Sequence, residues 1–111
     1  MPIVTANYSD IDHDKLAATM GLKKHYIAML LESFKEESDI LLNALHVAIE
    51  AVEYANIRCN AHAIKGSAGN MRFEAVYEMA KEMELAASAC REDFEYKIYF
   101  HAIKSAIETI S

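Results

Sequence analysis

The segment from Ala61 to Asn70, AHAIKGSAGN, places a histidine, a lysine and two glycines close together. On a helix with 3.6 residues per turn these four share one face, because Gly66 and Gly69 follow His62 by four and seven residues. A neutral imidazole is a good nucleophile near its unperturbed pKa of about 6.5. Lys65 adds a cation that can stabilise a transferred phosphoryl group. The pattern predicts an exposed nucleophilic histidine.

The two glycines need an explanation, because each costs a helix about 1 kcal/mol relative to alanine. The chain has three glycines in all, and Gly66 and Gly69 both lie beside His62. We interpret them as open ground for an approaching partner protein. Two other interpretations stay open: close packing of a neighbouring helix, or, for Gly69, a cap at the helix end.

Arg58 and Cys59 lie on the same predicted face, about one turn before His62. Both are candidate docking contacts for a partner, and Arg58 is equally compatible with an ordinary solvated charge. A nucleophilic pair of Cys59 and His62 is disfavoured, because nothing in the sequence marks an oxyanion hole or a third residue.

No metal site is predicted. The remaining histidines are interpreted as ordinary surface or core residues, and a site built from them is a weaker alternative: His13, His25, His46 and His101. Residues 10–14, DIDHD, resemble the start of a calcium loop. Such a loop needs glycine at its sixth position and glutamate at its twelfth, where this chain has Lys15 and Gly21.

Length and composition indicate one globular domain: 111 residues, 53% hydrophobic and 25% charged, with a net charge of -6. The acidic balance argues against nucleic-acid binding. No run is long enough to span a membrane, and no signal peptide is evident. Cys59 and Cys90 lack the spacing of a disulfide framework or a zinc site. We therefore expect a cytoplasmic protein without membrane or nucleic-acid partners.

Helical periodicity and the scarcity of proline and glycine predict an all-α fold. Five helices are expected, at about 10–20, 23–52, 54–70, 74–90 and 93–110. Ser9 or Asp10 would cap the first helix, and Gly21 would end it. Short connections favour an antiparallel four-helix bundle with a short extra N-terminal helix. Residues 1–9 are predicted as a tail and residues 10–111 as the domain.

The core should be made by one apolar stripe on each of the last four helices. On the second helix the stripe comprises Ile27, Leu30, Leu31, Phe34, Leu41, Leu42, Leu45 and Ile49, with the polar stretch 35–39 facing water. On the third it comprises Ile57, Ala61, Ile64, Ala68 and Met71, and on the fourth Val76, Met79, Ala80 and Met83. On the fifth it comprises Ile98, Ala102, Ile103, Ala106, Ile107 and Ile110.

The motif HAIKGSAGN resembles the phosphoacceptor motif of histidine-containing phosphotransfer (HPt) domains of bacterial phosphorelays, of the stand-alone type. The likeness extends over the chain from about Asp10, through the long second helix and through MAKEMELAA. It implies that His62 is phosphorylated on Nε2, that Lys65 stabilises the phosphoryl group and that Gly66 leaves room for it. It also implies that Glu84, 22 positions beyond the histidine, lies close to it.

The resemblance further implies the partners: receiver domains of response regulators or of hybrid histidine kinases. It implies no ATP site and no cofactor in this chain, because the magnesium used in transfer belongs to the receiver. We expect a monomer.

One departure from the family pattern lies at Arg72, where a glycine is common. If the turn there needs positive φ, a non-glycine residue costs about 1–2 kcal/mol. Either Asn70 adopts that conformation or the turn is rebuilt. Arg72 is also a candidate contact for an acidic receiver site.

Two other functions are compatible with the sequence. One is an adaptor bundle that binds a receiver or kinase without being phosphorylated. The other is the phosphoacceptor domain of a larger, chemotaxis-type histidine kinase. The dimerising domain of ordinary sensor kinases is disfavoured, because its histidine is typically followed by an acid and soon by a proline, and HAIKGSA has neither.

Overall fold

A computed structural model describes residues 5–110, and these form five helices and no strand. The helices are α1 (His13–Met20), α2 (Lys24–Glu50), α3 (Tyr54–Asn70), α4 (Glu74–Ser88) and α5 (Tyr96–Glu108). The predicted all-α class is confirmed. The ends differ from prediction by up to three residues, most at the start of α1 and of α5.

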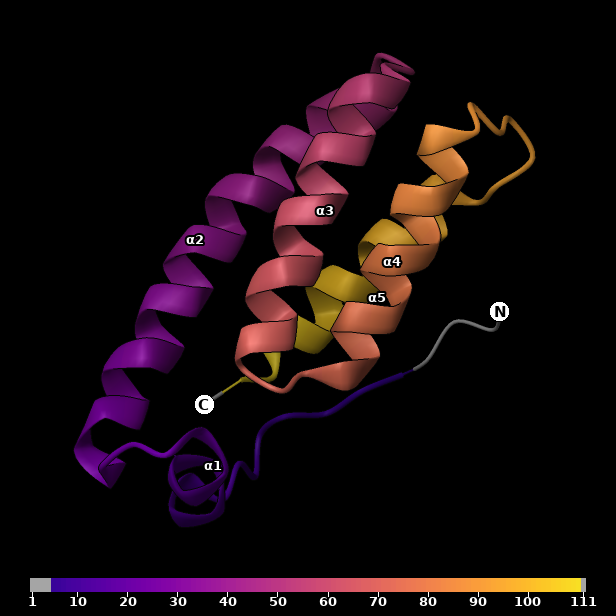
Figure 1. The fold of residues 1–111 in the computed structure, drawn as a ribbon. Coiled ribbons are helices and arrows are strands. Elements are labelled where there is room, and N and C mark those ends of the chain that lie inside the picture. The colour runs from indigo at the N-terminus through magenta and orange to yellow at the C-terminus, as the bar shows by residue number, and fades with distance from the viewer. Residues whose placement is uncertain (1–4, 111) are drawn as a thin grey trace.

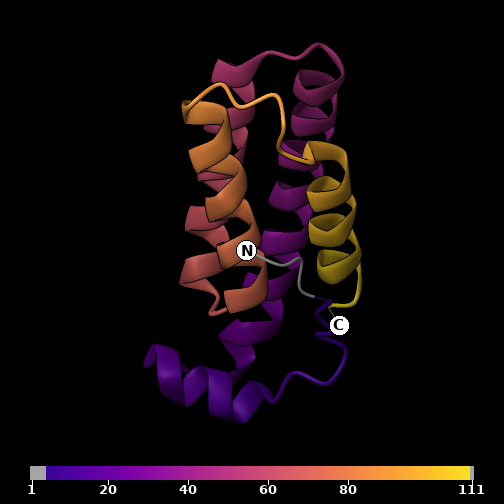
Figure 2. The same ribbon diagram turned by 90° about the vertical axis from the view of Figure 1, so that its right-hand side faces the viewer.

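The four longer helices form a bundle, and α1 lies across one end of it (Figures 1 and 2). Each helix of the bundle contacts two others: α3 packs against α2 and α4, and α5 packs against α4 and α2. The short α1 packs against α2. Helix α3 therefore lies between α2 and α4, and only its outward face is left for partners. No helix in the described part of the chain is both long and apolar enough to cross a bilayer.

The predicted core stripes are largely confirmed. All five core positions expected on α3 and at its end are buried, as are all four on α4. Two positions differ from prediction. Ile98 is 50% exposed, because α5 turns Tyr99 and Phe100 inward instead, and Ser38 is buried within the stretch that was expected to face water.

Helix α1 begins later than predicted because its cap is Asp12, rather than Ser9 or Asp10. The Asp12 carboxylate accepts a hydrogen bond from the Lys15 backbone N–H at 3.1 Å. At the other end Gly21 adopts φ 68°, as predicted for the residue after a helix.

Three other helices end in the same way without glycine. Val52, Arg72 and Cys90 follow α2, α3 and α4 with φ values of 53°, 65° and 52°. In each case the next backbone N–H donates to the carbonyl five residues earlier, as from Phe73 to Ala68 at 2.9 Å. Arg72 itself therefore adopts the left-handed conformation, and the proposal that Asn70 would do so is wrong.

Part of the predicted tail lies against the bundle. The Tyr8 ring is 4.5 Å from the ring of Phe73 between centroids, and the Tyr8 backbone N–H donates to Thr109 Oγ1 at 2.7 Å. Residues 1–4 of that tail, and Ser111, lie outside the described residues.

Candidate functional site

The rotation of α3 about its axis is set by its apolar face. Ile57, Ala61, Ile64 and Ala68 are all buried against the neighbouring helices. His62 follows Ala61 by one residue and is therefore turned outward, where its side chain is 64% exposed. The core of the bundle thus fixes the direction in which the imidazole points.

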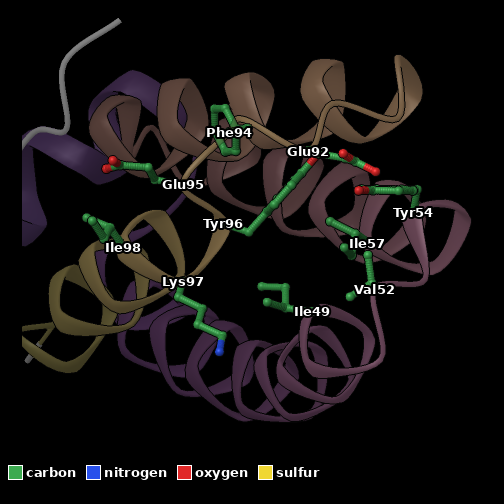
Figure 3. Close-up of a pocket in the computed structure, with 10 residues that line it drawn as sticks. All are labelled: Ile49, Val52, Tyr54, Ile57, Glu92, Phe94, Glu95, Tyr96, Lys97 and Ile98. Carbon is green, nitrogen blue, oxygen red and sulfur yellow. The ribbon is translucent and has the colours of Figure 1, made fainter.

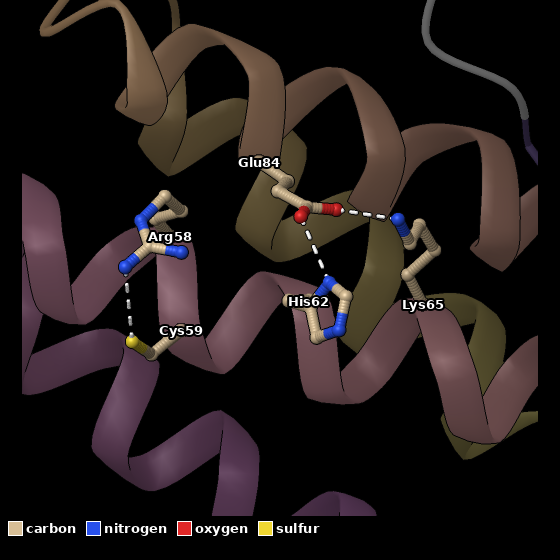
Figure 4. Close-up of polar contacts among 5 residues, drawn as sticks. All are labelled: Arg58, Cys59, His62, Lys65 and Glu84. Carbon is tan, nitrogen blue, oxygen red and sulfur yellow. Dashed lines mark hydrogen bonds and ion pairs between the residues drawn. The ribbon is translucent and has the colours of Figure 1, made fainter.

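A carboxylate from α4 meets this histidine. Oε2 of Glu84 lies 2.8 Å from Nδ1 of His62, and Oε1 of Glu84 lies 2.7 Å from Nζ of Lys65 (Figure 4). One carboxylate therefore holds two side chains of α3, one with each oxygen. His62, Lys65 and Glu84 are the sequence-predicted site residues that the structure brings together.

The contact with Glu84 defines how the imidazole can react. An ionised carboxylate only accepts hydrogen bonds, so it favours the form of neutral His62 that carries its proton on Nδ1. The lone pair is then on Nε2, which faces away from Glu84 in Figure 4. No residue in the described range hydrogen-bonds to Nε2. The arrangement presents an oriented imidazole nitrogen to solvent.

The ion pair beneath the imidazole stays charged at neutral pH. The side chain of Glu84 is only 16% exposed, and burial alone would raise its pKa. The hydrogen bonds from Lys65 and His62 outweigh burial, so the pKa of Glu84 is lower than its ordinary value. The hydrogen bond to Glu84 raises the pKa of Lys65.

The two glycines have different surroundings. A Cβ atom added at Gly66 would meet no other atom within 4 Å, so the surface there is open. A Cβ at Gly69 would lie 3.3 Å from Cδ2 and 3.5 Å from Cε2 of Tyr77 on α4. Close helix packing, one of the interpretations left open by the sequence, therefore accounts for Gly69. The open surface at Gly66 agrees with the interpretation of partner access, which stays a prediction.

The other predicted residues lie apart from this trio. Arg58 and Cys59 contact each other, with 3.8 Å between Nη2 and Sγ, and Cys59 does not reach His62 (Figure 4). Arg72 lies at the far end of α3, where its Nη1 donates to the carbonyls of Gly69 and Asn70 at 3.2 and 3.3 Å. Both carbonyls lie in the last turn of α3, where the Gly69 carbonyl also accepts from the Arg72 backbone N–H at 3.2 Å, and the guanidinium adds to these contacts of the turn.

The comparison with family models gives one match, to the Hpt domain, over residues 29–111. The chain belongs to the Hpt domain family. Neither the search of curated proteins nor the search of solved structures gave a match. Membership implies histidine phosphotransfer in a phosphorelay and contact with receiver domains. The match begins within α2, so α1 lies outside it, whereas His62, Lys65 and Glu84 lie inside.

Two residues near His62 were not predicted from the sequence: Ser67, within the Hpt motif, and Tyr77 on α4. Ser67 donates to Glu37 Oε1 at 2.8 Å, which ties α3 to α2 next to Gly66. Tyr77 covers Gly69 from α4. Tyr77 precedes Glu84 by seven residues and so shares its face of α4, a spacing that could have been noticed. No sequence signal pairs Ser67 with Glu37.

The described residues of this Hpt domain contain no group of three or more histidine, cysteine, aspartate or glutamate side chains that could hold a metal ion. The absence of a resident metal stays a prediction.

Proposed function

We propose that His62 is the phosphoacceptor of this Hpt domain. In this proposal Nε2 takes a phosphoryl group from the aspartyl phosphate of one receiver domain and passes it to the aspartate of another. The observation that carries the proposal is the 2.8 Å contact between Nδ1 and Glu84, which leaves Nε2 with its lone pair directed away from the protein.

The transfer is an in-line displacement at phosphorus. The Nε2 lone pair forms the N–P bond as the P–O bond to the receiver aspartate breaks, and the aspartate leaves as a carboxylate. The Nδ1 proton stays in its hydrogen bond to Glu84, so no proton has to move in this step. The reverse displacement by a second aspartate returns the imidazole to its starting state.

Lys65 is proposed to stabilise the charge on the moving phosphoryl group. Its ammonium shares the Glu84 carboxylate with His62 and is therefore held beside the imidazole. In the unphosphorylated protein the ammonium is paired with Glu84. The proposal requires that the Lys65 ammonium contacts the phosphoryl oxygens during transfer, either while it remains beside Glu84 or after it has left that carboxylate.

Access for the receiver is proposed to depend on Gly66. The missing side chain leaves open surface one turn from His62, and the neighbouring Ser67 is fixed to Glu37 of α2. Magnesium is proposed to be supplied by the receiver, and ATP is not used by this chain. These assignments leave positioning and charge stabilisation as the contributions of the Hpt domain.

The test is transfer from a receiver domain carrying a radiolabelled aspartyl phosphate, with wild type, His62→Gln and His101→Gln compared. His101 is an exposed histidine on α5 and serves as the matched control. We expect an acid-labile, base-stable label on wild type and on the control, and none on His62→Gln. Chelation of magnesium should stop transfer but leave label already on His62 in place. Label on His62→Gln would refute the assignment.

The adaptor function gives a different result in the same experiment. It predicts that a receiver binds wild type and His62→Gln equally and that neither protein becomes labelled. Receiver binding is therefore measured alongside transfer, so that a mismatched receiver is distinguished from an unphosphorylated bundle.

A further inference from the structure

A second concave site lies at the end of the bundle where α2 turns into α3 and the chain enters α5 (Figure 3). This pocket has a volume of about 400 Å³, within the range of small-molecule sites. Its apolar lining comprises Ile49, Val52, Tyr54, Ile57, Phe94, Tyr96 and Ile98. It is separate from the phosphotransfer site, because Tyr54 precedes His62 by more than two helical turns and Ile57 is buried on the core face of α3, whereas His62 is exposed.

The aromatic wall of this pocket is held in place. The ring centroids of Tyr54 and Tyr96 lie 6.1 Å apart at 50°, and those of Phe94 and Tyr96 lie 4.9 Å apart at 60°. The Tyr96 hydroxyl donates to the Arg91 carbonyl at 2.8 Å, which fixes that ring. Ring faces carry negative electrostatic potential and attract cations.

Two of the three charged residues that line the pocket are acidic, the same sign as the ring faces. Glu92 and Glu95 line it, and neither forms an ion pair with another residue in the described range. Lys97 also lines it, but its Nζ lies 3.5 Å from Glu50 Oε1 and is already paired. Burial first, and then the charge of Glu92, raise the pKa of Tyr54, in agreement with a negative field here.

Arg91, in the loop before α5, is also paired. Arg91 donates to both oxygens of Asp93 at 3.1 and 3.2 Å. On the opposite rim, Val52 keeps its side chain 60% exposed in a left-handed conformation that is costly for a β-branched residue. The pocket therefore combines uncovered apolar surface with two carboxylates that form no ion pair in the described part of the chain, while its lining cation, Lys97, is paired with Glu50.

We propose that this pocket binds a small organic cation of the alkylammonium class. The apolar body would lie on Ile49 and Ile57, and the charged head would lie over the tyrosine rings and towards Glu92. An anion would be repelled by both glutamates, and a neutral molecule of the same shape would leave them without a counter-charge. The proposal is independent of phosphotransfer at His62.

The test uses choline as the cation and 3,3-dimethylbutan-1-ol as its neutral isostere, each titrated into ¹⁵N-labelled protein. We expect choline to give saturable amide shifts at the residues that line the pocket. We expect the neutral alcohol to bind about fivefold more weakly. Because both ligands meet the unaltered protein, misfolding of a variant cannot obscure this comparison.

The two glutamates are then tested by the double substitution Glu92→Gln with Glu95→Gln. The matched control removes two exposed carboxylates of α2 by Glu36→Gln with Asp39→Asn. We expect the first pair to weaken choline binding about threefold or more and the control to leave it unchanged. Equal binding of the two ligands, equal effects of the two double variants, or no saturable shift up to roughly 50 mM choline would each overturn the proposal.

Discussion

Nδ1 of His62 lies 2.8 Å from Oε2 of Glu84, across the contact between α3 and α4. The second oxygen of the same carboxylate lies 2.7 Å from Nζ of Lys65. One side chain of α4 thus sets both the protonated nitrogen of the imidazole and the place of the neighbouring cation. Glu84 is therefore a positioning residue for the proposed transfer. Its hydrogen bond to His62 and its negative charge can be tested separately.

The hydrogen bond is tested by comparing Glu84→Gln with Glu84→Ala. The glutamine amide oxygen can still accept from Nδ1, so transfer to His62 should fall only a few-fold. Alanine removes the acceptor. A hydrogen bond to a charged group contributes roughly 1.5–3 kcal/mol, so the rate of transfer to His62 should fall by about tenfold to a hundredfold.

Imidazole ¹⁵N chemical shifts report which nitrogen of His62 carries the proton, and a general loss of stability would not change them. They should report the proton on Nδ1 in wild type and a shift towards the other form in Glu84→Ala. If alanine and glutamine slow transfer equally, or if the proton position does not change, Glu84 does not orient the ring.

The charge of Glu84 is tested by the pH dependence of stability. Because its folded pKa is lowered, the ionised carboxyl stabilises the folded state above its unfolded pKa, and this contribution is lost as the pH falls through the folded pKa. Lys65 has a raised pKa, so its contribution is complete below the unfolded lysine pKa and is lost only as the pH rises through the folded value.

Glu84→Gln should therefore lower the free energy of unfolding by roughly 1 kcal/mol at pH 7, and the difference should shrink below about pH 4. Urea unfolding at both pH values measures this. Glu36→Gln, an exposed position on α2, is the control and should show no such change. A wild-type advantage that persists unchanged at low pH would contradict the role given to the carboxylate charge.

The sequence predicted the helices and most of the core. Each buried stripe repeats at helical spacing, so it can be recognised from residues that are close together in the sequence. The face shared by His62, Lys65 and Gly66 was predictable for the same reason. The prediction for Ile98 was wrong because this residue lies about 140° around α5 from Ile103, whereas Tyr99, four residues before Ile103, shares the buried face.

Contacts between helices were less predictable. Glu84 was placed near His62 only through the family resemblance, since a spacing of 22 residues has no local geometric meaning. Gly69 was assigned to partner access because its helix face was known and the α4 side chain above it was not. That side chain is Tyr77, and only the packed structure shows it.

The glycines give a matched pair of substitutions. Gly66→Ala should raise the stability of the protein by about 1 kcal/mol, because the added Cβ meets open space in a helix interior. Gly69→Ala should gain less, or lose stability, because its Cβ would lie 3.3 Å from the Tyr77 ring. Thermal or urea unfolding of the two variants measures the difference.

Bulk at Gly66 should affect transfer in the opposite sense. Gly66→Leu should keep or raise helix content and yet slow phosphotransfer to His62, by up to about a hundredfold if the receiver is displaced by 1 Å. Circular dichroism and transfer kinetics on the same sample measure the two effects. Transfer at the normal rate with leucine at this position would show that the open surface is not needed by the partner.

Arg72 offers a test of the cost of its left-handed conformation. Arg72→Ala loses the guanidinium contacts with the carbonyls of Gly69 and Asn70 and keeps the unfavourable φ of 65°. Arg72→Gly loses the same contacts but relieves the conformation. The glycine variant should therefore be the more stable of the two by about 1 kcal/mol, since glycine's greater backbone entropy in the unfolded state offsets part of the relief. Equal stability of the two variants in urea unfolding would show that the turn is not strained. The free energy of unfolding of wild type should exceed that of the alanine variant by about 1 kcal/mol, which is the contribution of its two exposed hydrogen bonds.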